Sequence, residues 1–276
     1  MNFRLGAPFS SAFWCSLSLL LSVAACSPSE TPLELAVQDL APTGTLRAAI
    51  NVGNPILAHE DLASGELRGL SVDLSRELAA RLGVPLELLL YRSAGAVVQD
   101  ATTGAWDVAY NAIDPTREEI IRYTAPYLTI AGAYLVRDES SIRVNTDVDR
   151  DDTTVVVATG SAYDLFLTRE LQQAELVRVP TSPEVVDRFL EGSFDVAAGV
   201  RQQLEADADR IPGLRLFEES FMEIRQAMAI PRSRGDAGAN YVEEFIEDMK
   251  SLDAIAEALA RYGIEGVSVV PPSSTH

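Results

Sequence analysis

The sequence predicts an α/β fold made of two β/α units. Between residues 45 and 113, the apolar patterns alternate in the order strand, helix, strand, helix, strand, which is typical of a parallel sheet with helices on both faces. The same alternation returns between residues 153 and 217, and a strand at 224–230 then leads into the last long helix. One unit is therefore inserted between two parts of the other. Parallel sheets bind ligands at the carboxyl ends of their strands, so we expect a ligand in the cleft between the units.

The first unit starts with an alternating strand at 45–52 and a helix at 71–82. Leucines recur at every fourth position of this helix and line one face, and Gly83 follows as its C-cap. The remaining elements of the unit are expected at 84–91 (strand), 95–103 (helix), 106–113 (strand) and 128–136 (strand).

The second unit opens with a strand of valines and threonines at 153–158, followed by a tight turn at Gly160-Ser161. Its further elements are expected at 161–172 (helix), 175–179 (strand), 183–191 (helix), 194–198 (strand) and 214–217 (strand). After the return strand, apolar residues recur at helical spacing from Val242 to Leu259, with Gly263 just past them, which predicts one long helix.

The composition is that of an acidic globular protein. The chain has 276 residues, enough for two modest domains or one large one, and 47% hydrophobic residues exclude general disorder. The formal net charge is −19, and Lys250 is the single lysine. Such a surface repels nucleic acid and anionic lipid headgroups. An anion site must therefore be built locally, from helix ends and arginines.

The N-terminus carries the features of a targeting segment. Arg4 supplies a positive charge, and the apolar run at 13–23 has the length of a signal-peptide core. Leu21-Ser22-Val23-Ala24-Ala25-Cys26 resembles a bacterial lipobox, so we expect residues 1–25 to be a signal peptide and Cys26 to be lipidated and anchored to the inner or outer membrane. A plain secretory signal with an incidental cysteine is the alternative.

Residues 26–43 are rich in Pro, Ser and Thr and are predicted to be a tether. Cys15 would leave with the signal peptide and Cys26 would be acylated, so the folded body has no thiol. This excludes a disulfide framework, a thiolate nucleophile and a cysteine-based metal site.

The segment Asp114-Pro115-Thr116-Arg117 lies between a predicted strand and a predicted helical turn. Asp114 suits an N-cap and Pro115 the first helical position. Arg117 then places a cation where the helix dipole is already positive. It either pairs with a nearby acid (Asp114, Glu118 or Glu119) or forms part of an anion site.

Gly160-Ser161 is the second candidate for an anion site, because a strand ends there and a helix begins. Ser161, Ala162 and Tyr163 would offer free backbone N–H groups. The turn lacks the Lys and glycines of a phosphate loop, and an ordinary Ser N-cap is the alternative explanation. Both candidates occupy the same point of their own β/α unit, so they are expected to face one another across the cleft.

Features of an enzyme are few. The two histidines are His59, in a predicted loop, and His276, the last residue, and the sequence has no Ser/His/Asp order or metalloprotease motif. The acidic run from Asp147 to Asp152 lacks the Gly and terminal Glu of a calcium loop and is interpreted as a solvated loop between the units. We expect no catalytic residue, no metal site and no cofactor.

Seven stretches resemble, in family order, the motifs of the family 3 extracellular solute-binding proteins, the periplasmic amino-acid receptors of ABC importers. They are Gly44-Thr45-Leu46-Arg47, Gly69-Leu70-Ser71-Val72-Asp73-Leu74, Gly104-Ala105-Trp106-Asp107, Asp114-Pro115-Thr116-Arg117, Tyr123-Thr124-Ala125-Pro126-Tyr127, Gly160-Ser161-Ala162 and Gly192-Ser193-Phe194-Asp195. The resemblance implies a two-lobed periplasmic-binding-protein fold (type II), in which two β/α lobes are joined by two hinge strands.

The resemblance also implies the domain boundaries. Lobe 1 is expected at 44–134 plus 226–266, lobe 2 at 135–225 and a tail at 267–276. The hinge strands are expected near 132–138 and 220–228.

In that family the arginine that matches Arg117 holds the carboxylate of the ligand, helped by the turn that matches Ser161-Ala162. Other positions depart from the family pattern. The acidic residue for the amino group of the ligand falls on Val200, next to Arg201, so the ammonium of an ordinary α-amino acid would have no evident partner.

The walls of the expected pocket depart as well. The aromatic platform expected near Asn54 is missing, and the aromatic residue that opens the next helix falls on Ala94. A hydroxyl residue becomes Ala112, and a threonine becomes Asp114. The expected ligand-binding residues are Arg117, Asp114, Tyr110, Ala112, Ser161, Ala162, Arg201 and Asn54.

The resemblance implies closure on a small ligand and its delivery to an ABC permease in the inner membrane. Together with the lipobox-like sequence, it leads us to expect a monomeric periplasmic lipoprotein that captures a carboxylate-bearing ligand. We expect an organic anion or modified amino acid in place of a standard α-amino acid. One alternative is a periplasmic lyase of the cyclohexadienyl-dehydratase type, for which Asp114 is the candidate acid. Another is a sensor or assembly lipoprotein with a shallow or sealed cleft.

Overall fold

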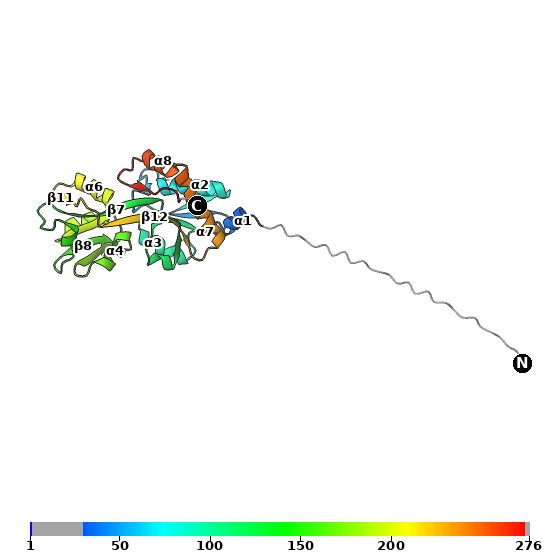
Figure 1. Ribbon diagram of the computed structural model, residues 1–276, viewed down its shortest axis with the longest axis horizontal. Coiled ribbons are helices and arrows are strands. Elements are labelled where there is room, and N and C mark those ends of the chain that lie inside the picture. The colour runs from blue at the N-terminus through cyan, green and yellow to red at the C-terminus, as the bar shows by residue number, and fades with distance from the viewer. Residues whose placement is uncertain (2–29, 274–276) are drawn as a thin grey trace. The chain divides into compact units, whose positions relative to one another are not determined.

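The computed structural model describes Met1 and residues 30–273, and from Thr31 onward the chain forms one compact unit. Within this unit two lobes are joined by long strands (Figure 1). Apart from Met1, the expected signal peptide at 1–25 lies outside the described residues, and so does Cys26. Among the described residues, no helix is long and apolar enough to cross a membrane.

Lobe 1 is built around a parallel sheet in which β1 pairs with β4 and β5. Its elements are α1 (Pro32–Leu40), β1 (Leu46–Asn51), β2 (His59–Glu60), β3 (Leu67–Arg68), α2 (Leu70–Leu82), β4 (Leu86–Tyr91), α3 (Ala94–Gln99), η1 (Asp100–Thr102), β5 (Val108–Ala112), η2 (Arg117–Glu119), β6 (Ile121–Tyr123), α7 (Asp236–Ser251) and α8 (Ala254–Arg261). The predicted helix at 71–82 is confirmed as α2, and Gly83 caps it in the left-handed conformation, with φ 68°.

Lobe 2 repeats this plan, with β8 paired in parallel to β9 and β10. Its elements are η3 (Asn145–Asp147), β8 (Thr154–Ala158), α4 (Ala162–Glu170), β9 (Glu175–Val179), α5 (Glu184–Glu191), β10 (Val196–Val200), α6 (Arg201–Arg210) and β11 (Leu214–Leu216). One aspartate plays the same part in each lobe. The backbone N–H of Arg47 donates to Asp107 Oδ2 and that of Thr154 to Asp195 Oδ2, each over 2.9 Å.

Two antiparallel strands, β7 (Leu128–Arg137) and β12 (Met222–Pro231), connect the lobes (Figure 1). On one side β12 pairs with β5 of lobe 1, and on the other β7 pairs with β10 of lobe 2. The sheet therefore runs β4-β1-β5-β12-β7-β10-β8-β9, and the short β13 (Ser268–Val269) pairs with β7. The two long strands match the expected hinges, whereas the residue boundaries proposed for the lobes stay predictions.

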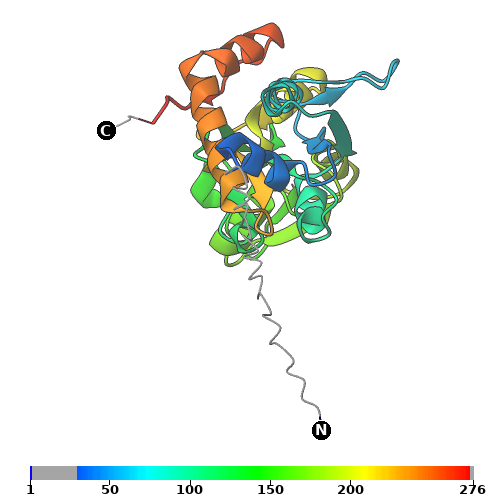
Figure 2. The same cartoon turned by 90° about the vertical axis from the view of Figure 1, so that its right-hand side faces the viewer.

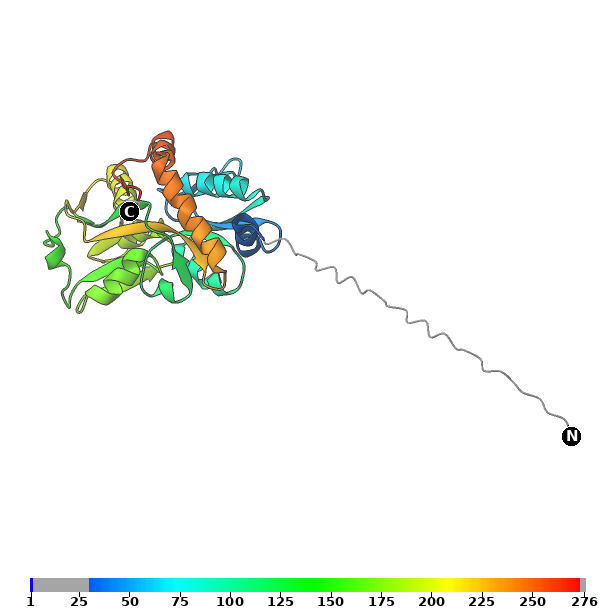
Figure 3. The same cartoon turned by 45° about the vertical axis from the view of Figure 1, so that its right-hand side comes forward.

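The tether prediction is wrong for residues 32–40, which form α1. Thr31 and Glu34 make a capping box at its start. Ala36 and Leu40 are fully buried, and Asp39 Oδ2 accepts a hydrogen bond of 2.8 Å from Gly238 N in the first turn of α7. Figures 2 and 3 both show the blue helix α1 against the orange helix α7. The segment is therefore part of lobe 1.

The prediction of one continuous C-terminal helix is also wrong, because α7 and α8 are separate helices. Between them Asp253 adopts a left-handed conformation with φ 55°, and Leu252 is exposed. Figure 2 shows the chain change direction at this break. After the turn, Ile255 and Leu259 are buried and α8 packs against α2.

Helix α6 was not predicted, and its composition explains why. Its sequence RQQLEADADR carries little apolar periodicity, and only Leu204 and Asp207 are buried. The strand expected at 194–198 is β10, Val196–Val200, and α6 begins at the next residue, Arg201. The small strands β2 and β6 were missed as well.

Candidate functional site

A cavity of about 40 Å³ lies between the lobes, where β1, β5, β8 and β10 end. This is the position that the predicted parallel sheets favour. Its lining residues are Asn51, Asn54, Leu57, Ala94, Tyr110, Asn111, Ala112, Arg117, Ser161, Ala162, Tyr163, Ser182, Val200, Ile224 and Gln226. Of the expected ligand-binding residues, the cavity brings together Arg117, Tyr110, Ala112, Ser161, Ala162 and Asn54.

Arg117 is buried, with 2% of its surface exposed, and reaches from lobe 1 to lobe 2. Its Nη1 donates to Ala112 O over 2.9 Å, and its Nη2 donates to Gly160 O over 2.7 Å. Its Nε is buried without a hydrogen-bond partner. Within residues 30–273 its hydrogen bonds go to backbone carbonyls, and no carboxylate is paired with it. A buried guanidinium without a counter-charge is costly unless an anion joins it.

The facing wall is the start of α4. Ser161 is its N-cap, and its hydroxyl accepts a hydrogen bond of 3.0 Å from Asp164 N. Ser161 N itself donates to Ala158 O, so it is not one of the free donors that the sequence suggested. The N–H groups of Ala162 and Tyr163 belong to the first helical turn, where the helix offers them no acceptor. They can add two donors to an anion held by Arg117.

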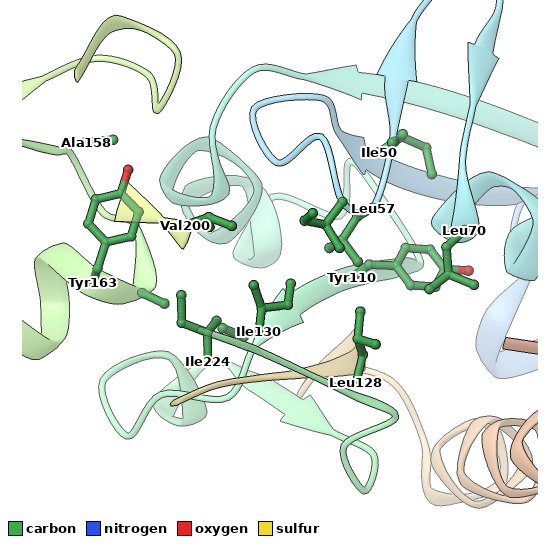
Figure 4. Packing of buried hydrophobic residues seen from close by; sticks show 14 of the residues in the cluster. Ile50, Leu57, Leu70, Tyr110, Leu128, Ile130, Ala158, Tyr163, Val200 and Ile224 are labelled. Atoms are coloured by element: carbon green, nitrogen blue, oxygen red, sulfur yellow. The ribbon is translucent and has the colours of Figure 1, made fainter. Parts of the chain in front are cut away.

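Apolar and phenolic side chains fill the rest of the wall. Figure 4 shows Tyr110 and Leu57 on one side, with Val200, Ile224 and Tyr163 on the other. The Tyr110 hydroxyl lies 2.9 Å from Ser75 Oγ, and Ser75 donates its only hydrogen to Ser71 O. Tyr110 therefore donates to Ser75, away from the cavity.

Both phenols are neutral at physiological pH. Burial raises the pKa of Tyr163 to about 12, although its bond to Ser182 opposes the shift. Burial also raises the pKa of Tyr110, against the effect of Ser75. Neither tyrosine supplies a negative charge to the cavity.

Asp114 and Arg201 do not line the cavity. Asp114 Oδ2 lies 2.9 Å from Arg169 Nη2 of α4, and Asp114 Oδ1 accepts a hydrogen bond from Thr116 N. The helical residues that follow begin at Arg117 and not at Pro115, but Asp114 makes the hydrogen bonds of an N-cap, because its backbone carbonyl also accepts from Glu118 N. Arg201 opens α6 and donates to Phe217 O and Glu218 O.

The lobes touch beside the cavity at two glycines. A Cβ on Gly95 would lie 3.1 Å from Thr159 O, and a Cβ on Gly160 would lie 3.0 Å from Gly95 Cα. A side chain at either glycine would push the facing backbone away by a few tenths of an ångström. A volume of 40 Å³ holds only a few water molecules. A ligand must enter after the lobes separate about β7 and β12.

Four amide side chains belong to the lining, and the sequence pattern predicts only Asn54 among them. The others are Asn51, Asn111 and Gln226. Asn111 interrupts the otherwise apolar end of a buried strand, which was the available signal. No Asp or Glu belongs to the lining, and among the described residues no group of His, Cys, Asp or Glu could hold a metal ion.

Comparison with known proteins identifies a family. The model for bacterial extracellular solute-binding proteins, family 3, matches residues 46–265. No curated protein matches the chain. Many solved structures share its fold.

Three of these structures illustrate the similarity. A mutant of ArgBP from T. maritima is 19% identical, with a TM-score of 0.71 over 83% of this chain and 100% of that one. A putative ABC-transporter binding component from Wolinella succinogenes, complexed with lysine, is 23% identical, with a TM-score of 0.69 over 81% and 97%. The ancestral amino acid-binding protein AncCDT-1, a precursor of cyclohexadienyl dehydratase, is 20% identical, with a TM-score of 0.69 over 82% and 98%.

Proposed function

The chain belongs to the bacterial extracellular solute-binding proteins of family 3, and we propose that it captures a small carboxylate and delivers it to an ABC permease. The observation that carries this proposal is Arg117. It is the buried arginine of the described residues, it lines the inter-lobe cavity, and no carboxylate of residues 30–273 is paired with it. A ligand carboxylate would supply the missing charge and accept charge-assisted hydrogen bonds.

The cavity supports a ligand other than a standard α-amino acid. Val200 occupies the position expected for an acid, and the lining has no Asp or Glu. An ammonium group would be desolvated there without a counter-charge, which costs several kcal/mol. The ligand proposed here is therefore an organic carboxylate or a modified amino acid.

Calorimetric titration of the protein with a panel of small carboxylates tests the proposal. Arg117→Gln should weaken binding about 10- to 100-fold, because a hydrogen bond to a charged group contributes about 1.5–3 kcal/mol. Arg122→Gln is the matched control, since Arg122 pairs with the exposed Asp236. Equal affinities of Arg117→Gln and the unchanged protein for every carboxylate would overturn the proposal.

The lyase alternative depended on Asp114 as an acid in the cleft. Asp114 is paired with Arg169 and does not line the cavity, so its position does not support that alternative. The sensor alternative is favoured by one observation, the small volume of the cavity. It predicts that no small molecule raises the melting temperature, whereas a transport ligand stabilises the folded state by mass action.

We also propose that the protein acts as a monomer in the periplasm, anchored through a lipid on Cys26. This rests on the lipobox-like sequence and on the extracellular location of the family. Mass spectrometry of the N-terminal peptide from membrane-extracted protein tests the anchor. A peptide that starts at Cys26 with acyl chains is expected, and a Cys26→Ser variant should be released in soluble form.

A further inference from the structure

Two amide side chains of the cavity, Asn111 on β5 and Gln226 on β12, are buried without all of their hydrogen-bond partners. We propose that they select a carboxylate whose second polar group is uncharged and both donates and accepts hydrogen bonds, as a carboxamide or hydroxyl does. This inference rests on the proposed function, because the carboxylate of the same ligand would be held by Arg117.

Asn111 lacks more hydrogen-bond partners than Gln226 does. It is 2% exposed, and neither its Nδ2 nor its Oδ1 has a partner in the described structure. Gln226 is 4% exposed, and its Oε1 has no partner. Buried polar groups are nearly always hydrogen-bonded in folded proteins. Polar atoms without partners in a ligand cavity therefore indicate which groups a ligand supplies.

The sheet register places the two amides on different faces of the sheet. Gln226 pairs with Ala112, the residue next to Asn111, across neighbouring antiparallel strands. Successive side chains of a strand point to opposite faces, so Asn111 and Gln226 lie on opposite faces of the sheet. Both residues line the cavity. They can therefore contact two different polar groups of one ligand.

The unpaired atoms define a complementary chemistry. Asn111 Nδ2 is a donor and needs an acceptor, whereas Asn111 Oδ1 and Gln226 Oε1 are acceptors and need donors. A primary carboxamide has one carbonyl oxygen and two N–H bonds, which satisfies both atoms of Asn111 and leaves a further donor. A hydroxyl satisfies the donor and one acceptor. A methyl group of the same size satisfies none.

The side-chain oxygens of the other two amides of the cavity already accept hydrogen bonds from the backbone. Asn51 Oδ1 accepts a hydrogen bond from Gly53 N, and Asn54 Oδ1 accepts one from Ile56 N. An ammonium group could donate to the two free amide oxygens, but no carboxylate of the lining would balance its charge. The charged side chain of the lining is Arg117, which has the same sign. The cavity therefore favours an uncharged group.

Calorimetric titration with small carboxylates of matched size tests the inference on the full chain. Glycolate, glycine and propionate differ in a hydroxyl, an ammonium and a methyl group, and succinamate and 4-oxopentanoate differ in a carboxamide and a methyl ketone. We expect glycolate to bind at least about tenfold more tightly than glycine and propionate. We expect succinamate to bind at least about tenfold more tightly than 4-oxopentanoate. Asn111→Leu and Gln226→Met should remove that preference and keep propionate binding. Gln172→Met, on the exposed surface of lobe 2, is the control.

A second variant keeps the test informative if the apolar substitutions unfold the protein. Gln226→Glu adds the missing carboxylate and should shift the preference toward glycine over glycolate by about tenfold. If all probes bind with equal affinity and Arg117→Gln weakens the binding of each, this inference is overturned. The proposed function would then still stand. Tighter binding of glycine than of glycolate by the unchanged protein would overturn it as well. Failure of every carboxylate to bind would overturn both.

Discussion

Asp114 of lobe 1 and Arg169 of lobe 2 form an ion pair, with 2.9 Å between Oδ2 and Nη2. Asp114 lies on the same loop as Arg117, and Nη2 of Arg117 donates a hydrogen bond across the cleft to Gly160 O. Two contacts from one short segment therefore hold the lobes together. Asp114 thus has an ion-pair partner in the facing lobe.

Loss of the ion pair is expected to weaken closure. Arg169 is 41% exposed, so the pair contributes about 0.5–1 kcal/mol. Arg169→Gln should therefore weaken ligand binding about two- to fivefold, because closure contributes to the measured affinity. Titration calorimetry measures the affinity, and small-angle scattering measures the radius of gyration without ligand. Arg188→Gln, an exposed site on α5, is the control. Unchanged affinity and radius in Arg169→Gln would contradict the prediction.

Asp107 is expected to be a determinant of stability. It is fully buried and pairs with Arg47 and Arg234, and it raises the pKa of Arg47 by favouring the charged form. Asp107→Ala leaves two cations without a partner, which costs about 3–5 kcal/mol. The melting temperature should fall by about 6 °C or more. Asp236→Asn removes the carboxylate of an exposed ion pair and should change the melting temperature little. Similar melting temperatures for the two variants would refute this role.

Helix α1 is expected to contribute to folding. Gly235 precedes α7 and has no side chain to cap it, and Asp39 of α1 supplies a carboxylate to Gly238 N instead. Asp39→Ala should destabilise the protein by about 1 kcal/mol, as loss of an N-cap does. Deletion of residues 31–41 should cost more, because Ala36 and Leu40 are fully buried. Denaturant unfolding measures both changes. A deletion variant with unchanged stability would show that this segment is a tether after all.

The buried tyrosines predict a loss of stability in alkali. Burial raises the pKa of Tyr123 and Tyr163 from 10.0 to about 12 and also that of Tyr110. Tyrosine ionises near pH 10 in the unfolded chain, so unfolding releases protons above that pH. The stabilisation is complete below pH 10 and is lost as the pH rises toward 12. Denaturant unfolding between pH 9 and 12 measures this decrease, and tyrosinate absorbance provides the titration. A folded protein whose tyrosines titrate near pH 10 would disprove it.

Much of the fold follows from local patterns. The leucine spacing of α2 and the valine run of β8 each predict one element, because each buries one face against the core. Helix α1 also had a local signal, since Thr31, Pro32 and Glu34 are typical of a helix start. The Ser-, Pro- and Thr-rich residues on either side of α1, at 27–31 and 42–43, concealed that signal. Helix α6 had almost none, because few of its side chains are buried.

By itself, the sequence determined the two β/α units, the family and the position of Arg117 at a strand end, because periodicity and chain order are local properties. The tertiary structure decided what each polar group contacts. It pairs Asp114 with Arg169, 55 residues further along the chain, and it buries Asn111 and Gln226 in one cavity. Such contacts depend on how the lobes close and how the strands pair. Local sequence patterns do not encode those distances, so the contacts of these polar side chains follow only from the folded chain.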